Sequence, residues 1–234
     1  SPSQDESELN AGFMWHTIKR VSKSSPLLET SVTTFVPKDD NVEIMYVTVR
    51  NLSHKELSLT PYAAIPIYGR SADNVTSMLH RIKTTENGVL VRPTMSFDEK
   101  GHRINHKTYY VCGFTAKGQS PEGFFPTVEE YIGEGGTFTH PRAVCEKRPG
   151  VPASSTAEGR EAMGAFRFQN LTLLPGDKAA YIILFGVENE ESRIEEICQK
   201  YNKRRQTRWR RQKHTGRIRC PSASRQETKI LTAL

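Results

Sequence analysis

The sequence has little of what marks several large classes of protein. Its 234 residues include only four cysteines, and no two of them form a CxxC pair, so neither a disulfide scaffold nor a zinc site with paired cysteines is favoured. We therefore predict reduced thiols in a cytoplasmic protein. There is also no apolar run of about 20 residues and no signal peptide at SPSQDESELN, so we expect no contact with a membrane. The four cysteines are Cys112, Cys145, Cys198 and Cys220.

Catalytic motifs with a fixed spacing are also missing. GEGGTF (Gly133–Phe138) is rich in glycine, but no Gly-Lys-Ser/Thr follows it, so we predict a tight turn with positive φ and not a phosphate loop. His102 and His106 lie four residues apart, yet they belong to no HExxH pattern and lead into a strand-like segment. A Gly-x-Ser-x-Gly elbow is absent, which disfavours a serine hydrolase. We predict no metal site and no cofactor.

Positive charge is confined to one end of the sequence. Residues 200–234 hold twelve of the 33 Lys and Arg and a single acid, Glu227, so this segment carries +11 and residues 1–199 carry −4 of the net +7. The stretch KRRQTRWRRQKHTGRIRC, with Trp209 among its arginines, is of a kind that binds phosphate backbones and stacks bases. Because the acidic body does not share this character, nucleic-acid binding is a third hypothesis that we do not favour.

What the sequence does contain is a series of strand-like segments separated by turns. Val42–Asn51 is rich in β-branched and aromatic residues, and Glu56–Gly69 and Lys107–Thr115 have the same character. Phe166–Leu174 and Ala179–Val187 read as two strands joined by a Leu-Pro-Gly-Asp turn. The stretches between the strands are predicted to be long loops that contain Gly and Pro, notably 120–144 and 147–164.

One amphipathic helix is predicted to close the body. ENEESRIEEICQKYN begins with acidic residues near a cap at Asn189 and places four apolar or aromatic side chains on one stripe, namely Ile194, Ile197, Cys198 and Tyr201. The fold class is therefore all-β, an antiparallel β-sandwich over residues 11–189 with a C-terminal helix over 190–202, followed by the basic tail 203–234.

Acidic residues in the predicted loops suggest a glycosidase pair as one possible chemistry. Such enzymes hold two carboxylates about 5–10 Å apart, and Glu130 and Glu134 are the candidates for this pair. Aromatic faces beside acids suit a sugar. The alternative, which composition favours, is solvated loop acids beside aromatics of the core. The wider set contains Asp98, Glu122 and Glu129 with Tyr110, Phe124, Phe125 and Tyr131.

Three stretches of the chain resemble the glycoside phosphorylases of the cellobiose phosphorylase type, glycoside hydrolase family 94. They are PYAAIPIYGRSADN (Pro61–Asn74), MLHRIKTTENGVLVRPTMSFDEKGHRINHKTYYVCGFT (Met78–Thr115) and SPEGFFPTVEEYIGEGGTFTHPRAV (Ser120–Val144). The resemblance is nearest to the β-1,2-glucan branch, namely 1,2-β-oligoglucan phosphorylase and the carboxy-terminal part of cyclic β-1,2-glucan synthase. It extends from about Ala11 to Tyr201.

The resemblance implies a super-sandwich, galactose-mutarotase-like domain that precedes a linker and an (α/α)6 catalytic barrel. The barrel supplies the general-acid Asp and phosphate acts as nucleophile, but nothing in this chain matches the barrel, so no catalytic residue is carried over. The implied role is binding or assembly, with β-glucan or glucosides as partners and a homo-oligomer formed through the sandwich loops. The alternative is a small β-glucosidase-like enzyme that uses Glu130 and Glu134. The residues expected to face a sugar are Arg70, Asp73, Glu134, Gly135, Gly136, Thr137 and His140.

The resemblance also bears on the basic tail, because the family continues with a charge-balanced helix at this point. One permitted set of codons for Lys203–Gly216, read two nucleotides later, encodes AKTDKVETAETYW, which is a helix-forming sequence of the expected kind. We therefore expect that a frameshift near residue 202 produced the tail and truncated the chain before the barrel. The DNA sequence tests this expectation directly.

Overall fold

The computed structural model describes residues 5–23, 27–68, 80–98 and 101–202, which form strands in several antiparallel sheets and three helices. A large sheet contains β1 (Glu6–Gly12), β2 (Trp15–Val21), β3 (Leu28–Phe35), β4 (Val42–Asn51), β7 (His80–Thr84), β8 (Gly88–Pro93), β11 (Thr108–Thr115), β13 (Thr156–Glu158) and β16 (Lys178–Glu188). The remaining strands are β5 (Leu57–Leu59), β6 (Tyr62–Pro66), β9 (Met95–Asp98), β10 (Gly101–Ile104), β12 (Gly123–Thr127), β14 (Ala162–Arg167) and β15 (Leu171–Leu173). The helices are α1 (Val128–Ile132), α2 (Arg142–Cys145) and α3 (Glu191–Asn202).

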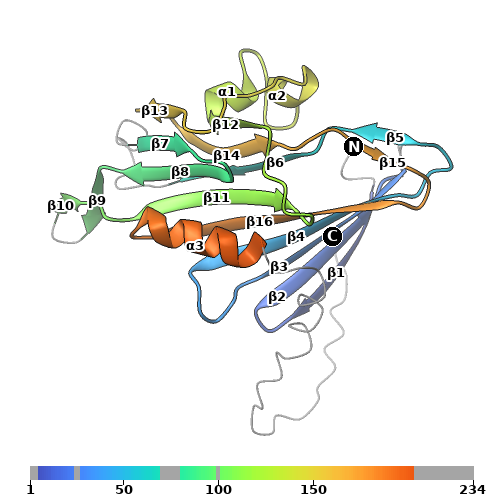
Figure 1. The fold of residues 1–234 in the computed structure, drawn as a ribbon, viewed down its shortest axis with the longest axis horizontal. Coiled ribbons are helices and arrows are strands. Elements are labelled where there is room, and N and C mark those ends of the chain that lie inside the picture. The colour runs from blue at the N-terminus through green and yellow to red at the C-terminus, as the bar shows by residue number, and fades with distance from the viewer. Residues whose placement is uncertain (1–4, 24–26, 69–79, 99–100, 203–234) are drawn as a thin grey trace, which may run out of the picture.

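These elements stack in layers (Figure 1). The large sheet has the order β1-β2-β3-β4-β16-β11-β8-β7-β13, and α3 lies on one of its faces. A three-stranded sheet, β12-β14-β6, covers part of the other face, and α1 and α2 lie on the outer side of that small sheet. The predicted all-β sandwich with a C-terminal helix is confirmed.

Strand β11 shows how the sequence sorts its side chains between the layers. Tyr110, Cys112 and Phe114 are buried in the core beneath α3, whereas Val111 is buried in the core between the two sheets. Successive side chains of a strand point to opposite faces of the sheet, so a strand covered on both faces contributes alternate apolar side chains to the two cores. The bounds of β4 agree with the predicted strand Val42–Asn51.

The predicted strand Phe166–Leu174 is divided in two. Its first part belongs to β14, which pairs with β6, and its last part to β15, which pairs with β5. The interruption lies opposite Pro61, which has no N–H to donate, and the amide of Phe168 donates to the Pro61 oxygen at 2.9 Å. The Leu-Pro-Gly-Asp turn is confirmed, since Asp177 N donates to Leu174 O at 3.0 Å, but it does not join two paired strands.

The predicted loop 120–144 is wrong for much of its length, because Gly123–Thr127 forms a strand that is buried throughout and the helices α1 and α2 also lie in this segment. Pro126 coincides with a shift in the pairing of β12 with β14, between Phe125 and Thr127. A proline can be placed in a strand at such an irregularity, where the ladder is already broken. The predicted loop 147–164 likewise contains β13 and the start of β14.

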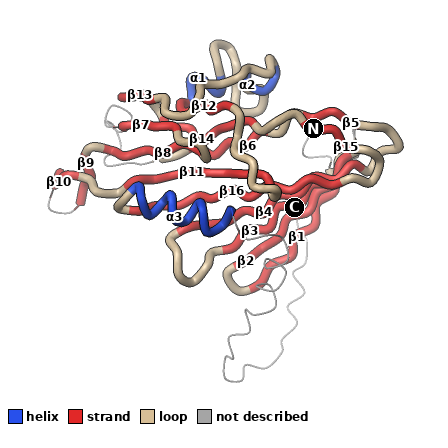
Figure 2. The backbone as a smooth tube through the Cα atoms, viewed as in Figure 1, coloured by secondary structure: helices blue, strands red, loops and turns tan. Residues whose placement is uncertain are grey.

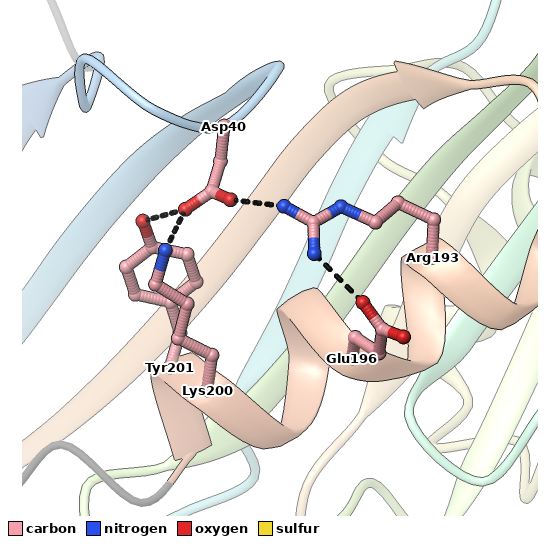
Figure 3. Close-up of polar contacts among 5 residues, drawn as sticks. All are labelled: Asp40, Arg193, Glu196, Lys200 and Tyr201. Carbon is pink, nitrogen blue, oxygen red and sulfur yellow. Dashed lines mark hydrogen bonds and ion pairs between the residues drawn. The ribbon is translucent and has the colours of Figure 1, made fainter.

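Helix α3 buries the stripe that its sequence predicted, with Ile194, Ile197, Cys198 and Tyr201 all in the core beneath it. Figure 2 shows α3 lying beside the strands of the large sheet. The helix is also fixed by a buried charge. The Asp40 carboxylate, on the loop before β4, has no exposed surface and accepts hydrogen bonds from Arg193 at 2.8 Å and from Lys200 and Tyr201 at 2.5 Å each (Figure 3). Within the described ranges no helix is long and apolar enough to cross a membrane.

Candidate functional site

Five of the seven predicted sugar-facing residues lie in one short segment. We call the segment Val128–Cys145, which comprises α1, α2 and the loop between them, the cap. The predicted residues Arg70 and Asp73 lie outside the described residues, as does the side chain of Asp98. The five residues that the cap brings together are Glu134, Gly135, Gly136, Thr137 and His140.

The first half of the cap loop is a glycine turn. Gly133 and Gly135 have φ angles of 72° and 70°, which confirms the tight turn predicted for GEGGTF. Gly136 N donates to Gly133 O at 3.1 Å, and a Cβ added at Gly136 would stand 2.0 Å from the oxygen of Ile132. The turn therefore needs the absence of a side chain at this position as well as left-handed backbone.

The second half of the loop is a turn of hydroxyl and imidazole groups. The His140 amide donates to Thr137 Oγ1 at 3.1 Å, and Thr139 Oγ1 lies 3.0 Å from Thr137 Oγ1 and 3.2 Å from His140 Nδ1. Phe138 stands among these polar groups with 54% of its surface exposed. The sequence interpretation did not include Phe138 among the candidate site residues, although an aromatic residue in a loop of Gly and Thr has few neighbours to bury it.

A depression of about 420 Å3 lies along α1 beside this loop. Its apolar members come from α1, and its acidic members come from α1, from the loop and from the residue before β14. An apolar surface edged by carboxylates can place the C–H face of a sugar while accepting hydrogen bonds from its hydroxyls. The lining residues are Val128, Glu129, Ile132, Gly133, Glu134 and Glu161.

The carboxylates of this region differ in what they already bind. Glu129 forms an ion pair with Arg160 at 2.8 Å, and both side chains are more than half exposed. Among the described residues, the Glu134 side chain has neither a hydrogen bond nor an ion pair, and it is exposed. Glu134 and Glu161 are thus the two carboxylates of the depression that no hydrogen bond or ion pair engages among the described residues.

Glu130, the other predicted catalytic acid, begins the helix α1. Its amide donates to Oγ1 of the N-cap residue Thr127 at 3.2 Å. The pKa of Glu130 is raised, because the effect of partial burial exceeds that of the hydrogen bonds from the backbone and side chain of Thr127, which lower it. This reciprocal arrangement is a capping box, and the Thr-x-x-Glu spacing in the sequence predicts it. The Glu130 carboxylate therefore has a structural partner.

Two arginines pack behind the glycine turn. Arg142 and Arg148 each bind the carboxylate of Glu146 at 2.7 Å, and the hydrogen bonds from Arg142 and then Arg148 lower the pKa of Glu146. A Cβ at Gly133 would stand 2.8 Å from Cβ of Arg142, so the turn and α2 are in close contact. Both arginines pack against the glycine turn, and neither lines the depression.

The aromatic residues that accompany the acids in the sequence do not reach this surface. Tyr110, Phe124, Phe125 and Tyr131 are at most 7% exposed, so they belong to the core. The interpretation of these aromatics as core residues, which composition favoured, is confirmed for these four. Phe138 is the exposed aromatic of the cap.

A second depression, of about 550 Å3, lies beside the loop between β3 and β4. Its surface is mostly apolar, and the Asp40 carboxylate at its margin already accepts three hydrogen bonds. Its one carboxylate is therefore already engaged, whereas Glu134 and Glu161 of the depression along α1 are not. The lining residues are Met14, Val36, Pro37, Lys38, Asp40, Asn41, Val42, Gly186 and Val187. In the described part of the chain, no three His, Cys, Asp or Glu side chains gather as metal ligands.

Comparison with known proteins places this geometry in a family. The family described as "Glycosyl hydrolase 94, supersandwich domain" matches residues 6–204. A solved structure of a polysaccharide lyase is similar at 9% identity and a TM-score of 0.40, over 78% of this chain and 22% of the lyase, so the chain spans about a fifth of that protein. No curated protein sequence matches the chain.

Proposed function

We propose that this chain, which belongs to the glycosyl hydrolase 94 supersandwich domain family, is the sugar-contacting domain of a β-glucan phosphorylase-type protein. In this proposal the cap binds a β-glucan without supplying the groups that react. The observation that carries it is the depression along α1, where the unengaged Glu134 lies on the same short loop as the exposed Phe138.

The chemistry of the cap suits a glucan in two ways. A phenyl ring such as that of Phe138 packs against the C–H face of a pyranose, and a carboxylate such as that of Glu134 accepts hydrogen bonds from sugar hydroxyls. The hydroxyls of Thr137 and Thr139 and the ring of His140 add donors and acceptors on the same exposed turn. The glycine turn, held from behind by Arg142, keeps these groups in place before a ligand arrives.

The competing proposal of hydrolysis by Glu130 and Glu134 is weaker on physical grounds. A glycosidase needs two carboxylates that are free to exchange protons or attack the sugar. Glu130 is engaged by Thr127 at the start of α1, and Glu129 is paired with Arg160. Among the three carboxylates of the cap, Glu134 thus lacks a second free acid, and the unengaged Glu161 beside it is not a member of the proposed pair.

The proposal is tested by calorimetric titration of the full chain with β-1,2-linked gluco-oligosaccharides, with maltotriose as the α-linked comparison. We expect Phe138→Ala and Glu134→Gln each to weaken glucan binding about tenfold, because stacking and charged hydrogen bonds contribute on the order of 1–2 kcal/mol each. Leu174→Ala is the matched control, since Leu174 is 53% exposed on a turn outside the cap.

Two results would overturn the glucan proposal. One is equal affinity in the wild type and the two cap variants, and the other is no heat of binding with any β-glucan at millimolar concentration. If the cap variants instead change the oligomeric state by light scattering, the cap contacts protein, and the assembly role replaces the sugar-binding role.

A further inference from the structure

Two buried thiols from distant parts of the chain meet beneath α3. Cys112 lies in the middle of β11 and Cys198 in the second half of α3, and their exposed fractions are 1% and 4%. Both belong to the core cluster between α3 and the large sheet, together with Tyr110 and Tyr201. Neither thiol takes part in the cap, so the proposed function leaves them unexplained.

The two side chains pack into the same core layer. Cys112 projects to the α3 face of the sheet, as its neighbours Tyr110 and Phe114 on the same strand do, and Cys198 is buried in the same core from α3. Both cysteines are free thiols in this structure. A small residue at each position allows α3 to approach the sheet closely, and closeness of this kind is what a disulfide between two elements requires.

We propose that Cys112 and Cys198 form an oxidation site, at which a low-molecular-weight disulfide converts the two thiols to a disulfide that joins α3 to β11. The Cys198 thiolate, or that of Cys112, first attacks the small disulfide and releases one small thiol. The second protein thiolate then displaces the other half, so that one Sγ–Sγ bond forms and two small thiols leave. The two electrons given up by the protein sulfurs reduce the small disulfide.

In the closed structure the reaction is held back by burial. The neighbouring Cys198 thiol and then burial raise the pKa of Cys112, which suppresses the thiolate that must attack. The oxidant therefore reaches the pair only when α3 lifts from the sheet. Three hydrogen bonds to the buried Asp40, from Arg193, Lys200 and Tyr201, oppose that motion (Figure 3). The Asp40 contacts thus control access to the thiols.

The test uses the full chain with Cys145→Ser and Cys220→Ser, which leaves only the pair of interest, incubated with oxidised glutathione. We expect an intact mass lower by two hydrogens, a cross-linked peptide containing Cys112 and Cys198, and a higher melting temperature that dithiothreitol reverses. Asp40→Asn should accelerate cross-linking about tenfold. Glu196→Gln is the matched control, because it removes the exposed partner of Arg193 and leaves the contacts of Asp40 intact, so its rate should equal that of the parent.

Several outcomes would overturn the proposal. Glutathione attached to both cysteines without a cross-link would mean that the thiols open but do not meet. An equal rate of cross-linking in Asp40→Asn and the parent would mean that the Asp40 contacts do not control access to the thiols. If Asp40→Asn does not fold, Arg193→Gln removes one of the three hydrogen bonds, and an unchanged rate there has the same meaning.

Discussion

The two helical surfaces of this molecule differ in how they are held. On the α3 side, four side chains of one helix are buried and the charge that anchors them, Asp40, has no exposed surface. On the cap side, α1 and α2 together bury Tyr131 and Ala143, and their ion pairs stand in solvent, as in Glu129–Arg160 with 68% and 56% exposure. The first surface stabilises the fold, while the second keeps its polar groups available for contact.

The largest effect on stability is expected from a pair of matched truncations, one in each helical surface. Ile197→Ala in α3 removes a fully buried side chain and should lower the free energy of unfolding by about 3 kcal/mol. Ile132→Ala in α1 removes a half-buried side chain and should cost about 1 kcal/mol. Urea denaturation of both variants measures the two values. Equal costs would mean that the cap is as strongly built into the core as α3 is.

Removal of the buried charge should have the next largest effect. Asp40→Asn deprives Arg193, Lys200 and Tyr201 of a charged acceptor, and we expect a loss of about 2 kcal/mol at neutral pH, measured by urea denaturation. Arg193 and Lys200 can regain water, since they are 43% and 34% exposed, which limits the loss. A loss below about 0.5 kcal/mol would contradict the assignment of Asp40 as the anchor of α3.

The same variant has a defined pH dependence. Burial alone would raise the pKa of Asp40, but hydrogen bonds from Lys200 and Tyr201 and the charges of Lys200 and Arg193 lower it below 3.8. The unfolded state therefore takes up a proton before the folded state does. The advantage of the wild type over Asp40→Asn should be complete above that ordinary value and should shrink as the pH falls towards the folded pKa. An advantage that grows on acidification would contradict this sign.

A smaller effect is expected where α1 begins. Thr127→Ala removes the oxygen that accepts from the Glu130 amide, and loss of an N-cap typically costs about 1 kcal/mol. Thr139→Ala, on the exposed turn of the cap loop, is the control and should change stability by less than about 0.5 kcal/mol. Thermal denaturation compares the two. An equal effect of both variants would argue against the capping box at Glu130.

The smallest effect is expected at the exposed ion pairs that directly follow the cap. Glu146→Gln breaks the contacts with Arg142 and Arg148, and because all three side chains are more than a third exposed, we expect a loss below about 0.5 kcal/mol that disappears in salt. Unfolding at low and high salt provides the measurement. A loss of several kcal/mol would make the cap resemble the α3 side and would end the contrast between them.

Sequence patterns predicted those elements whose own residues determine their structure. The apolar run of β4 and the stripe of α3 are local signals, and both were confirmed. The strand Gly123–Thr127 was hidden because glycine and proline indicate turns, whereas here the pairing with β14 decides the structure. Division of the strand after Arg167 depends on Pro61, more than 100 residues earlier in the chain, which no local pattern reveals.

The candidate site residues show the same contrast between local sequence signals and long-range contacts. The glycine turn at 133–136 was predicted from its residues, and the capping role of Glu130 was open to prediction from Thr-x-x-Glu but was missed. The Asp40 contacts could not be foreseen, because Asp40 and its partners on α3 are separated by most of the chain. Tertiary packing brings these residues together, and their spacing in the sequence does not indicate this contact.

We propose above that the cap is the sugar-contacting surface and that the α3 side is the scaffold. Amide chemical-shift mapping of the full chain, during titration with a β-1,2-linked glucotriose, distinguishes the two surfaces residue by residue. We predict that the largest saturable shifts fall on Gly133–His140 and along α1, with α3 and the loop around Asp40 unchanged. Shifts that cluster instead at Asp40 and α3, or that nowhere saturate, would contradict the account.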